Sequence, residues 1–216
     1  MGAAALPTLP RRDSEARTRL YAAASRAAPA LLARDRLLAV EPPFDAFLPD
    51  GGVRRGSTIA LDGPLGAGAT SIACALAAAA TAAGEWAAVV DTDGTFGARA
   101  ALDAGVALER CAVVRSIPPD RWATVVAALL DGVAVVVAAP PTNLRHGDAR
   151  RLVARARERA AVLVAFGAWP VEASLRLHAR GGVWHGLGKG SGLIVARDLD
   201  IDVEAKGMRR NVARAG

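Results

Sequence analysis

The apolar and polar positions of this chain predict strands and helices that alternate. Apolar runs typical of strands occur at 57–63, 86–91, 111–115, 133–139 and 161–166, and the last two lack the polar alternation of a half-exposed strand. Helical segments are predicted between and after them at 69–83, 96–104, 120–130, 146–160 and, with Pro170 at its first position, 170–179. This alternation predicts an α/β fold, in which a mostly parallel, twisted sheet is flanked by helices.

The two ends of the chain have a different pattern. Residues 181–207 alternate apolar and polar positions between glycine turns, which predicts antiparallel strands at one edge of the sheet. The first 50 residues predict a helical extension and linker, with helices over 13–28 and 30–38 on either side of Pro29. We therefore expect an N-terminal extension at 1–50, a core at 51–206 and a mobile basic tail at 207–216.

One glycine-rich stretch, LDGPLGAGATSIACAL at 61–76, is close to a phosphate-binding loop. Gly63, Gly68 and Thr70 fit the pattern G-x-x-x-x-G-K-[ST], whereas Ala69 stands at the lysine position. The backbone N–H donors of such a loop do not depend on that side chain, and Gly66 adds a further permissive position. Loss of the lysine removes roughly 1.5–3 kcal/mol of phosphate affinity.

We therefore expect the fold of a nucleotide-binding loop without efficient hydrolysis. No cofactor is expected beyond weakly bound ATP and magnesium, which Thr70 or Ser71 would contact. A plain strand–turn–helix connection with small residues for close packing explains the same sequence.

Composition and charge add an expectation about partners. The formal net charge is +6 and the pI is about 10.5, which favours an acidic partner such as nucleic acid. Candidate contacts to DNA or a protein fall into three groups. They are a helical stripe at i, i+4 and i+8 (Arg151, Arg155 and Arg159), two arginines of the tail (Arg209 and Arg210), and Trp169, which is expected in an exposed loop. The solvated outer face of a helix explains the stripe equally well.

The remaining composition points to a cytoplasmic protein. Cys74 and Cys111 lie in apolar runs without the spacing of a metal or redox site, and the three histidines show no metal spacing either. The N-terminal sequence lacks the order of a signal peptide, and no apolar run has the length of a membrane-spanning helix. We expect a protein of the cytoplasm that could also associate with the nucleoid, and we expect no contact with a membrane.

Several segments, taken in order, resemble the core of the RecA recombinases. They are GGVRRGSTIALDGPLGAGATS, AAVVDTDGTFGARAALDAGVALERCAVVRS, VAVVVAAP and AVLVAFGAW, within a resemblance that covers about 40–206. The chain is most similar to the RecA-like ImuA family, in particular its shortened actinobacterial branch, and is related to the SulA division inhibitors. The resemblance implies a RecA-like core with a degenerate nucleotide site.

The positions that handle nucleotide in that family are altered here. The phosphate-loop lysine is replaced by Ala69, and the family's Asp-x-Glu corresponds to Asp91-Thr92-Asp93. Ala138 lies near the place of the magnesium-ordering aspartate, and the segment AFGAW lacks the expected glutamine. The two DNA-binding loops of RecA proteins are short in this chain. The resemblance therefore implies a protein without an ATP cycle and without filament-type DNA binding.

The function implied by the resemblance is that of a non-catalytic adaptor in mutagenesis induced by DNA damage, as part of the SOS response. Its partner would be ImuB, which resembles a Y-family polymerase, and through ImuB an error-prone replicative-type polymerase during translesion synthesis. The sequence leaves three alternatives open: a SulA-like cell-division inhibitor, a weak ATPase acting as a recombination mediator, and a plain DNA-binding protein.

Overall fold

The computed structural model describes residues 36–187, 191–205 and 208–215, and the compact unit begins at Leu37. The helix expected over 13–28 and most of the one expected over 30–38 lie outside these residues. The last residues of the second helix are described, and there the prediction is wrong. Leu37–Ala39 forms strand β1, which pairs antiparallel with β2 (Gly52–Arg54).

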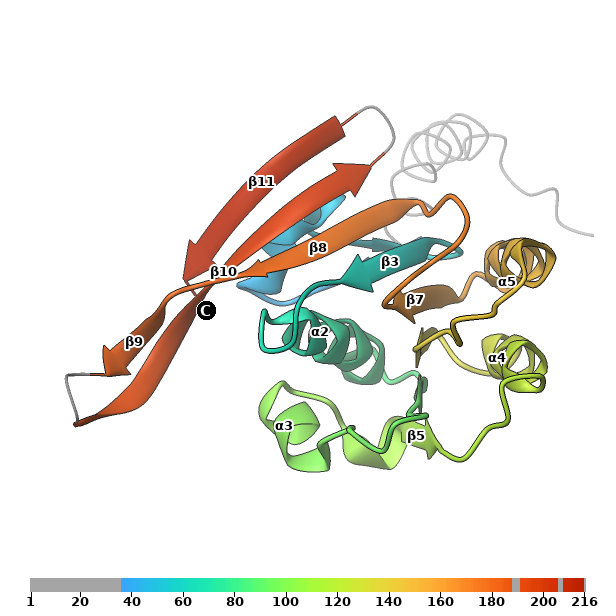
Figure 1. Cartoon of the computed structure of the whole chain (residues 1–216), viewed down its shortest axis with the longest axis horizontal. Helices are drawn as coiled ribbons and strands as arrows, with labels where there is room; N and C mark the ends of the chain where they lie inside the picture. Colours follow the sequence, from blue (N-terminus) through green and yellow to red (C-terminus); the bar gives the residue numbers. More distant parts are fainter. Residues whose placement is uncertain (1–35, 188–190, 206–207, 216) are drawn as a thin grey trace, which may run out of the picture. The chain divides into compact units, whose positions relative to one another are not determined.

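A mixed sheet forms the centre of this unit, in the order β5-β4-β6-β7-β3-β8-β10-β11 (Figure 1). Neighbours from β5 to β8 are parallel, whereas β10 runs antiparallel to β8 and β11 antiparallel to β10. The strands are β3 (Thr58–Asp62), β4 (Ala87–Val90), β5 (Cys111–Val114), β6 (Val135–Ala138), β7 (Val162–Phe166), β8 (Leu175–Gly181), β10 (Gly192–Ala205) and β11 (Met208–Ala215). A further strand, β9 (Trp184–Leu187), pairs with the first part of β10. The expected α/β class, mostly parallel with antiparallel edge strands, is confirmed.

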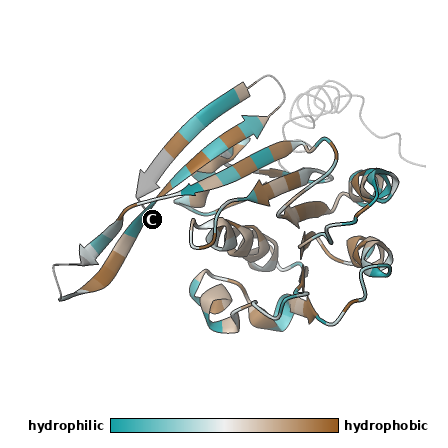
Figure 2. Ribbon diagram, viewed as in Figure 1, coloured by the Kyte–Doolittle hydropathy of each residue, from teal (hydrophilic) through white to brown (hydrophobic). Residues whose placement is uncertain are grey.

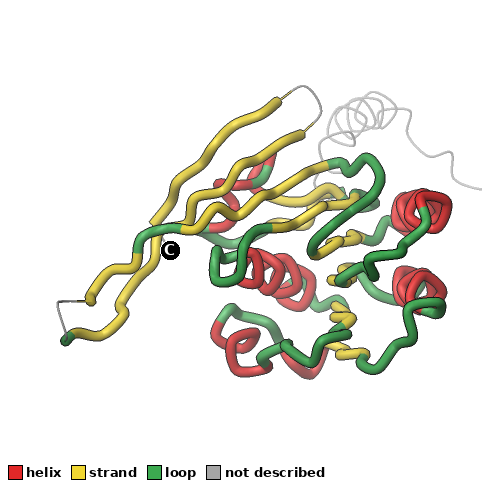
Figure 3. The backbone as a smooth tube through the Cα atoms, viewed as in Figure 1, coloured by secondary structure: helices red, strands yellow, loops and turns green. Residues whose placement is uncertain are grey.

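Helices cover the two faces of the parallel strands (Figures 1 and 3). They are α2 (Ala69–Ala82), α3 (Ala98–Asp103), α4 (Trp122–Leu130) and α5 (His146–Arg159). Alternate residues of one strand enter different cores: Ile59 and Leu61 of β3 pack in the core that contains α2, whereas Ala60 packs with α4 and α5. The buried, alanine-rich face of α2 lets the helix lie close to the sheet.

The linker between the N-terminal extension and the core is part of the fold rather than a separate segment. Short 3-10 turns lie at Phe44–Phe47 and Pro49–Gly51. Phe47 and Leu38 are buried in the same core as α2. The boundary expected near residue 51 therefore lies earlier, because apolar side chains from Leu38 onward pack in that core.

The helix predicted over 170–179 is also wrong, since β8 occupies Leu175–Gly181. Leu175, Leu177 and Ala179 are buried while the residues between them are more exposed, which is the period of a strand. This strand adds parallel to β3, with Leu175 opposite Ile59. Pro170 and the residues after it form an irregular connection instead.

The expected mobile tail forms a strand as well. Residues Met208–Ala215 are β11, and Arg209 pairs with Glu204 of β10 across the ladder. The segment has only two apolar residues larger than alanine, Met208 and Val212, so its extended form depends on pairing with β10 rather than on its own pattern. In Figure 2 teal and brown residues alternate along β8 and β10, as expected for strands with one covered and one open face.

Candidate functional site

The glycine loop joins β3 to α2 at the carboxyl end of β3, the edge at which α/β proteins usually bind ligands. Gly63, Gly66 and Gly68 all have positive φ, at 148°, 77° and 107°. A Cβ at Gly63 would lie 2.4 Å from the carbonyl oxygen of Ala179, and one at Gly68 would lie 2.5 Å from Cδ2 of Leu199. Close packing against β8 and β10 therefore requires two of the three glycines, independently of any phosphate.

The loop still presents the polar groups of a helix N-terminus. Within the described residues, the N–H groups of Ala69, Thr70 and Ser71 make no hydrogen bond to a protein acceptor, and the side chains of Thr70 and Ser71 are exposed. Ala69, where the phosphate-loop pattern would have a lysine, is only 6% exposed and packs in the core around α2. The loop thus keeps its backbone donors, but position 69 faces the protein interior.

A cation from a distant strand lies at this loop. Arg197 of β10 donates a hydrogen bond from Nη2 to the carbonyl oxygen of Gly66. Its guanidinium carbon lies 4.5 Å from the centre of the Trp184 ring, a cation–π contact. The Nε of Arg197 is buried without a partner in the described residues. The sequence analysis did not identify Arg197, because nothing in its local pattern links it to a loop 131 residues away.

Asp91 is a structural acceptor at the end of β4. Its Oδ1 accepts hydrogen bonds from the N–H groups of Thr95 (2.8 Å) and Phe96 (3.2 Å), and its Oδ2 accepts one from Nε of Arg115 (2.9 Å). Burial alone would raise the pKa of Asp91, but the hydrogen bonds from Arg115, Phe96 and Thr95 lower it overall. Asp91 therefore holds the loop after β4 in place as a carboxylate, whereas Asp93 is exposed.

Ala138 lies at the end of β6 and is fully buried. It pairs with Val90 of β4 and Ala165 of β7, and packs in the core formed with α4 and α5. This part of the sheet edge is therefore filled by apolar packing and carries no carboxylate on β6.

The arginine stripe of α5 is paired with acidic side chains. Arg155 forms two hydrogen bonds to Asp131, and Nε of Arg159 lies 3.0 Å from the same carboxylate. The hydrogen bond from Arg155 is the main cause that lowers the pKa of Asp131. Arg151 pairs with Asp148. The stripe exists as the sequence predicts, but it presents ion pairs rather than unpaired cations.

Trp169 does not serve as an exposed contact, so that expectation is wrong. Its exposed fraction is 7%, and it packs in the core with α4 and α5. Its ring nitrogen is buried without a hydrogen-bond partner in the described residues. Its position beside a proline in an irregular connection suggested exposure, but the side chain packs inward against the core with α4 and α5.

The two arginines expected in the tail lie on β11. Arg210 donates from Nη2 to the carbonyl oxygens of Ala46 and Leu48, at 3.3 and 3.4 Å, and so ties β11 to the 3-10 turns. Arg209 instead lines a groove on the open face of the sheet. Arg210 therefore makes a structural contact, whereas Arg209 lies at the surface.

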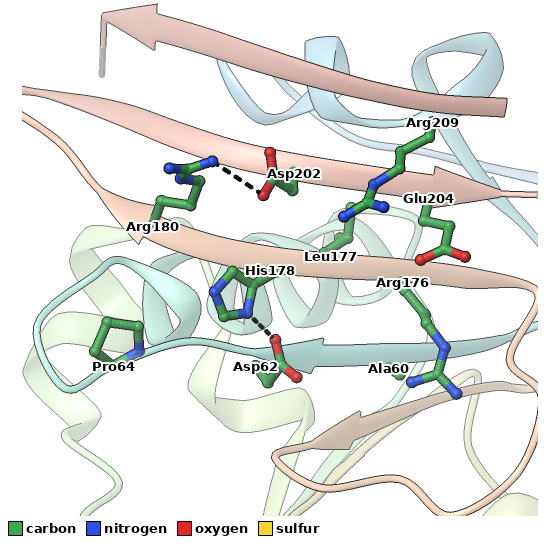
Figure 4. A pocket seen from close by; sticks show the side chains of 10 residues that line it. All are labelled: Ala60, Asp62, Pro64, Arg176, Leu177, His178, Arg180, Asp202, Glu204 and Arg209. Atoms are coloured by element: carbon green, nitrogen blue, oxygen red, sulfur yellow. Dashed lines mark hydrogen bonds and ion pairs between the residues drawn. The ribbon is translucent and has the colours of Figure 1, made fainter.

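That groove has a volume of about 570 Å³ and lies beside the glycine loop, across β3, β8, β10 and β11 (Figure 4). Nδ1 of His178 lies 2.5 Å from Oδ1 of Asp62, and Nη1 of Arg180 donates to Asp202 at 3.4 Å. Hydrogen bonds from Asn211 and Arg180 lower the pKa of Asp202. Three arginines and three carboxylates line the groove, namely Arg176, Arg180, Arg209, Asp62, Asp202 and Glu204.

Among the described residues that line it, the groove has no serine, threonine, cysteine or lysine that could act as a nucleophile, and no ligand set for a metal. Among the described residues, no group of three or more histidine, cysteine, aspartate or glutamate side chains could hold a metal ion. The arginines and carboxylates of the groove are equal in number, and Asp62 pairs with His178 and Asp202 with Arg180 across strands, so its simplest role is to stabilise the open face of the sheet. The sequence analysis missed it because β8 was predicted as a helix and β11 as a mobile tail, so the charged residues of β3 and β10 had no expected neighbours on this face.

The two cysteines do not form a reactive site. Burial raises the pKa of both thiols, and for Cys74 the neighbouring Cys111 raises it further. A thiol with a raised pKa is protonated at neutral pH and is a poor nucleophile. In the parts of the chain that the structure describes, no helix combines the length and apolar character needed to cross a bilayer.

The family model described as MT3502 N-terminal domain matches residues 46–171. The matched range contains the glycine loop and Asp91, and it ends before β8, so Arg197 and the groove residues of β8, β10 and β11 lie outside it. No curated protein matches the chain.

Proposed function

The chain belongs to the MT3502 N-terminal domain family, and we propose that it acts as a non-catalytic, RecA-like adaptor in DNA-damage-induced mutagenesis. The parallel sheet with antiparallel edge strands agrees with the RecA-like core that the sequence resemblance implies. The partner implied by that resemblance is the ImuB protein, and through it the error-prone polymerase of translesion synthesis. The nucleotide site of the fold serves only to support the structure.

The observation that carries this proposal is how the glycine loop is held. Gly68 packs against Leu199, and the carbonyl oxygen of Gly66 accepts a hydrogen bond from Arg197, so β10 fixes the loop without nucleotide. Most of the groups that would drive hydrolysis are replaced or engaged elsewhere, whereas Asp93, in the place of the family's glutamate, is exposed. Ala69 is buried at the lysine position, and Asp91 is bound to its own loop and to Arg115. In this proposal the loop is a structural element of the fold and does not hydrolyse nucleotide.

The paired arginines favour an adaptor over a DNA-binding protein. Phosphate contacts depend on cations that can exchange their counterions for the nucleic acid. Arg155 and Arg159 both engage Asp131, which occupies them within the protein itself. Direct DNA contact is therefore secondary in this proposal.

Co-elution with the ImuB protein of the same genome tests the proposal directly. At about 10 µM of each protein, we expect one peak in size-exclusion chromatography, and the same peak with or without ATP and magnesium. The variant Thr70→Ala, which changes an exposed loop residue, should co-elute equally well. Two separate peaks, or a complex that forms only with ATP, would overturn the proposal.

Calorimetry with ATP and magnesium tests the non-catalytic part separately. We expect no binding tighter than about 1 mM, since the cation at position 69 and the magnesium-ordering carboxylate are absent. Micromolar binding with turnover that is lost in Thr70→Ala would instead support a weak ATPase.

A further inference from the structure

The hairpin of β9 and the first part of β10 carries apolar side chains that the rest of the described protein does not cover. Its exposed apolar residues are Val183, Trp184, Leu193, Ile194 and Val195, with exposed fractions from 48% to 77%. In Figure 1 this hairpin extends beyond the helices that cover the parallel strands, and Figure 2 shows an apolar stretch along it. Contiguous exposed apolar surface of this kind marks an interaction site.

The backbone of the same stretch has a free edge. On one side, β10 pairs with β11 only from Asp198 onward, where Asp198 is opposite Ala215. On the other side it pairs with β9, and its residues 192 and 196 are opposite Leu187 and His185. No described strand therefore pairs with the β11 side of residues 192–197. An unpaired strand edge is a template for a strand of another chain.

The stretch also lacks the usual protection of an edge strand. Proteins commonly place charged residues or prolines on such edges to prevent pairing between molecules. Residues 192–196 read Gly-Leu-Ile-Val-Ala, without charge or proline. The next two residues are charged, but Arg197 binds the carbonyl oxygen of Gly66, and Asp198 lies 2.9 Å from Nε2 of His185. Pairing of residues 192–196 would leave no charge buried without a partner.

We propose that two copies of this chain pair antiparallel through residues 192–196, so that one sheet continues across a two-fold symmetric dimer. The partner strand would extend the line of β11, which is itself antiparallel to β10. In the symmetric register Ile194 lies opposite Ile194 of the second copy, and Leu193 lies opposite Val195. Every such pair is uncharged, so the edge is complementary to itself, as a two-fold interface requires.

The three consecutive apolar residues fit this role for a further reason. The register of β9 and β10 leaves Leu193, Ile194 and Val195 opposite the single residue Gly186. The backbone of this bulge is therefore not fully paired on its inner side, and it displays three apolar side chains together. Bulges that place side chains in this way are specific features of a strand rather than defects.

Sedimentation analysis of the full chain between about 1 and 100 µM tests the dimer. We expect the wild-type chain to dimerise in this range, and Ile194→Lys to raise the dissociation constant at least about a hundredfold. This change removes two apolar contacts and places like charges opposite each other. The matched control is Leu102→Lys on α3, because Leu102 is 51% exposed and Ile194 52%, and it should dimerise like the wild type. A wild-type chain that stays monomeric at 100 µM, or an Ile194→Lys variant that still dimerises, overturns the proposal.

Two further variants test the register. An equimolar mixture of Ile194→Lys and Ile194→Glu should form a heterodimer, although each variant alone stays monomeric. Ile194→Cys should form a disulfide between copies under mild oxidation, whereas Leu102→Cys should not. If the wild-type chain dimerises but neither the heterodimer nor the disulfide forms, the dimer uses another interface and the proposal is overturned. The dimer does not depend on the adaptor function, since binding of ImuB is measured separately by co-elution.

Discussion

Replacing Asp91 with asparagine separates a structural carboxylate from a catalytic one. The side chain is 4% exposed and accepts three hydrogen bonds, two from the backbone of its own loop and one from Arg115. Asparagine is nearly the same size, but it lacks the charge and keeps only one acceptor oxygen. Asp93, two residues along the chain, is exposed, so Asp93→Asn is the matched control.

The magnitude follows from these contacts. A hydrogen bond to a charged group contributes about 1.5–3 kcal/mol. Asparagine can still accept the two backbone N–H groups, and the Arg115 side chain is 56% exposed, so its contribution is reduced by solvent. We therefore expect Asp91→Asn to lower the free energy of unfolding by about 2 kcal/mol, or the Tm by about 4–8 °C for a unit of this size. Asp93→Asn should stay within about 0.5 kcal/mol of the wild type.

The pH dependence adds a second signature. The pKa of Asp91 is lower in the folded protein than in the unfolded chain, where an aspartate titrates near about 3.9. Its stabilisation is therefore complete above about pH 5 and is lost as the pH falls through the folded value. The stability difference between wild type and Asp91→Asn should be constant above pH 5 and should shrink below about pH 4.

Urea unfolding followed by tryptophan fluorescence at pH 7, 5 and 3.5 measures these differences. The structural assignment of Asp91 would be refuted if Asp91→Asn unfolded like the wild type at pH 7. A loss that persisted unchanged at pH 3.5 would also contradict it, because the charge would then not be its cause.

Three further predictions follow from the loop, the arginine stripe and the buried tryptophan. Gly68→Ala should lower the free energy of unfolding by about 2–4 kcal/mol in thermal unfolding, because the added Cβ would meet Leu199. Gly66→Ala should lower it by only about 1 kcal/mol, because there the cost comes from the positive φ alone. Asp131→Asn should release Arg155 and Arg159 of α5, so the affinity for single-stranded DNA at low salt should rise and should depend more steeply on salt. Unchanged binding would show that the pairing of these arginines does not limit the affinity for DNA. Trp169→Phe should change the unfolding free energy by less than about 1.5 kcal/mol, because it also removes an unpaired buried N–H, whereas Trp169→Ala should cost about 3–5 kcal/mol.

The part of the fold from β3 to β7 could be predicted from the sequence because its signals are local. The run at 133–139 contains β6, and the helical pattern at 146–160 contains α5, within two residues at each end. The altered loop at 63–71 was likewise visible, since its residues are neighbours in the chain. Short-range periodicity and fixed spacing carry this information directly.

The edge of the sheet was predicted less well because its strands depend on their partners. The segment of β8 has an alternating pattern, but a proline before it favoured a helix, and only the place beside β3 makes the strand stable. The tail residues of β11 have little apolar character, and their strand depends on the ladder with β10. Pairing of this kind joins residues that local patterns do not connect.

The sequence by itself determined the α/β class, the order of strands and helices from β3 to β7, and the absence of a lysine from the glycine loop. Only the tertiary structure decided that Arg197 lies on that loop, that Trp169 is buried and that residues 192–196 form an open edge. The physical reason is distance along the chain. Periodicity reports which face of an element is apolar, whereas the neighbour that each face or edge finds is fixed only when the whole sheet assembles.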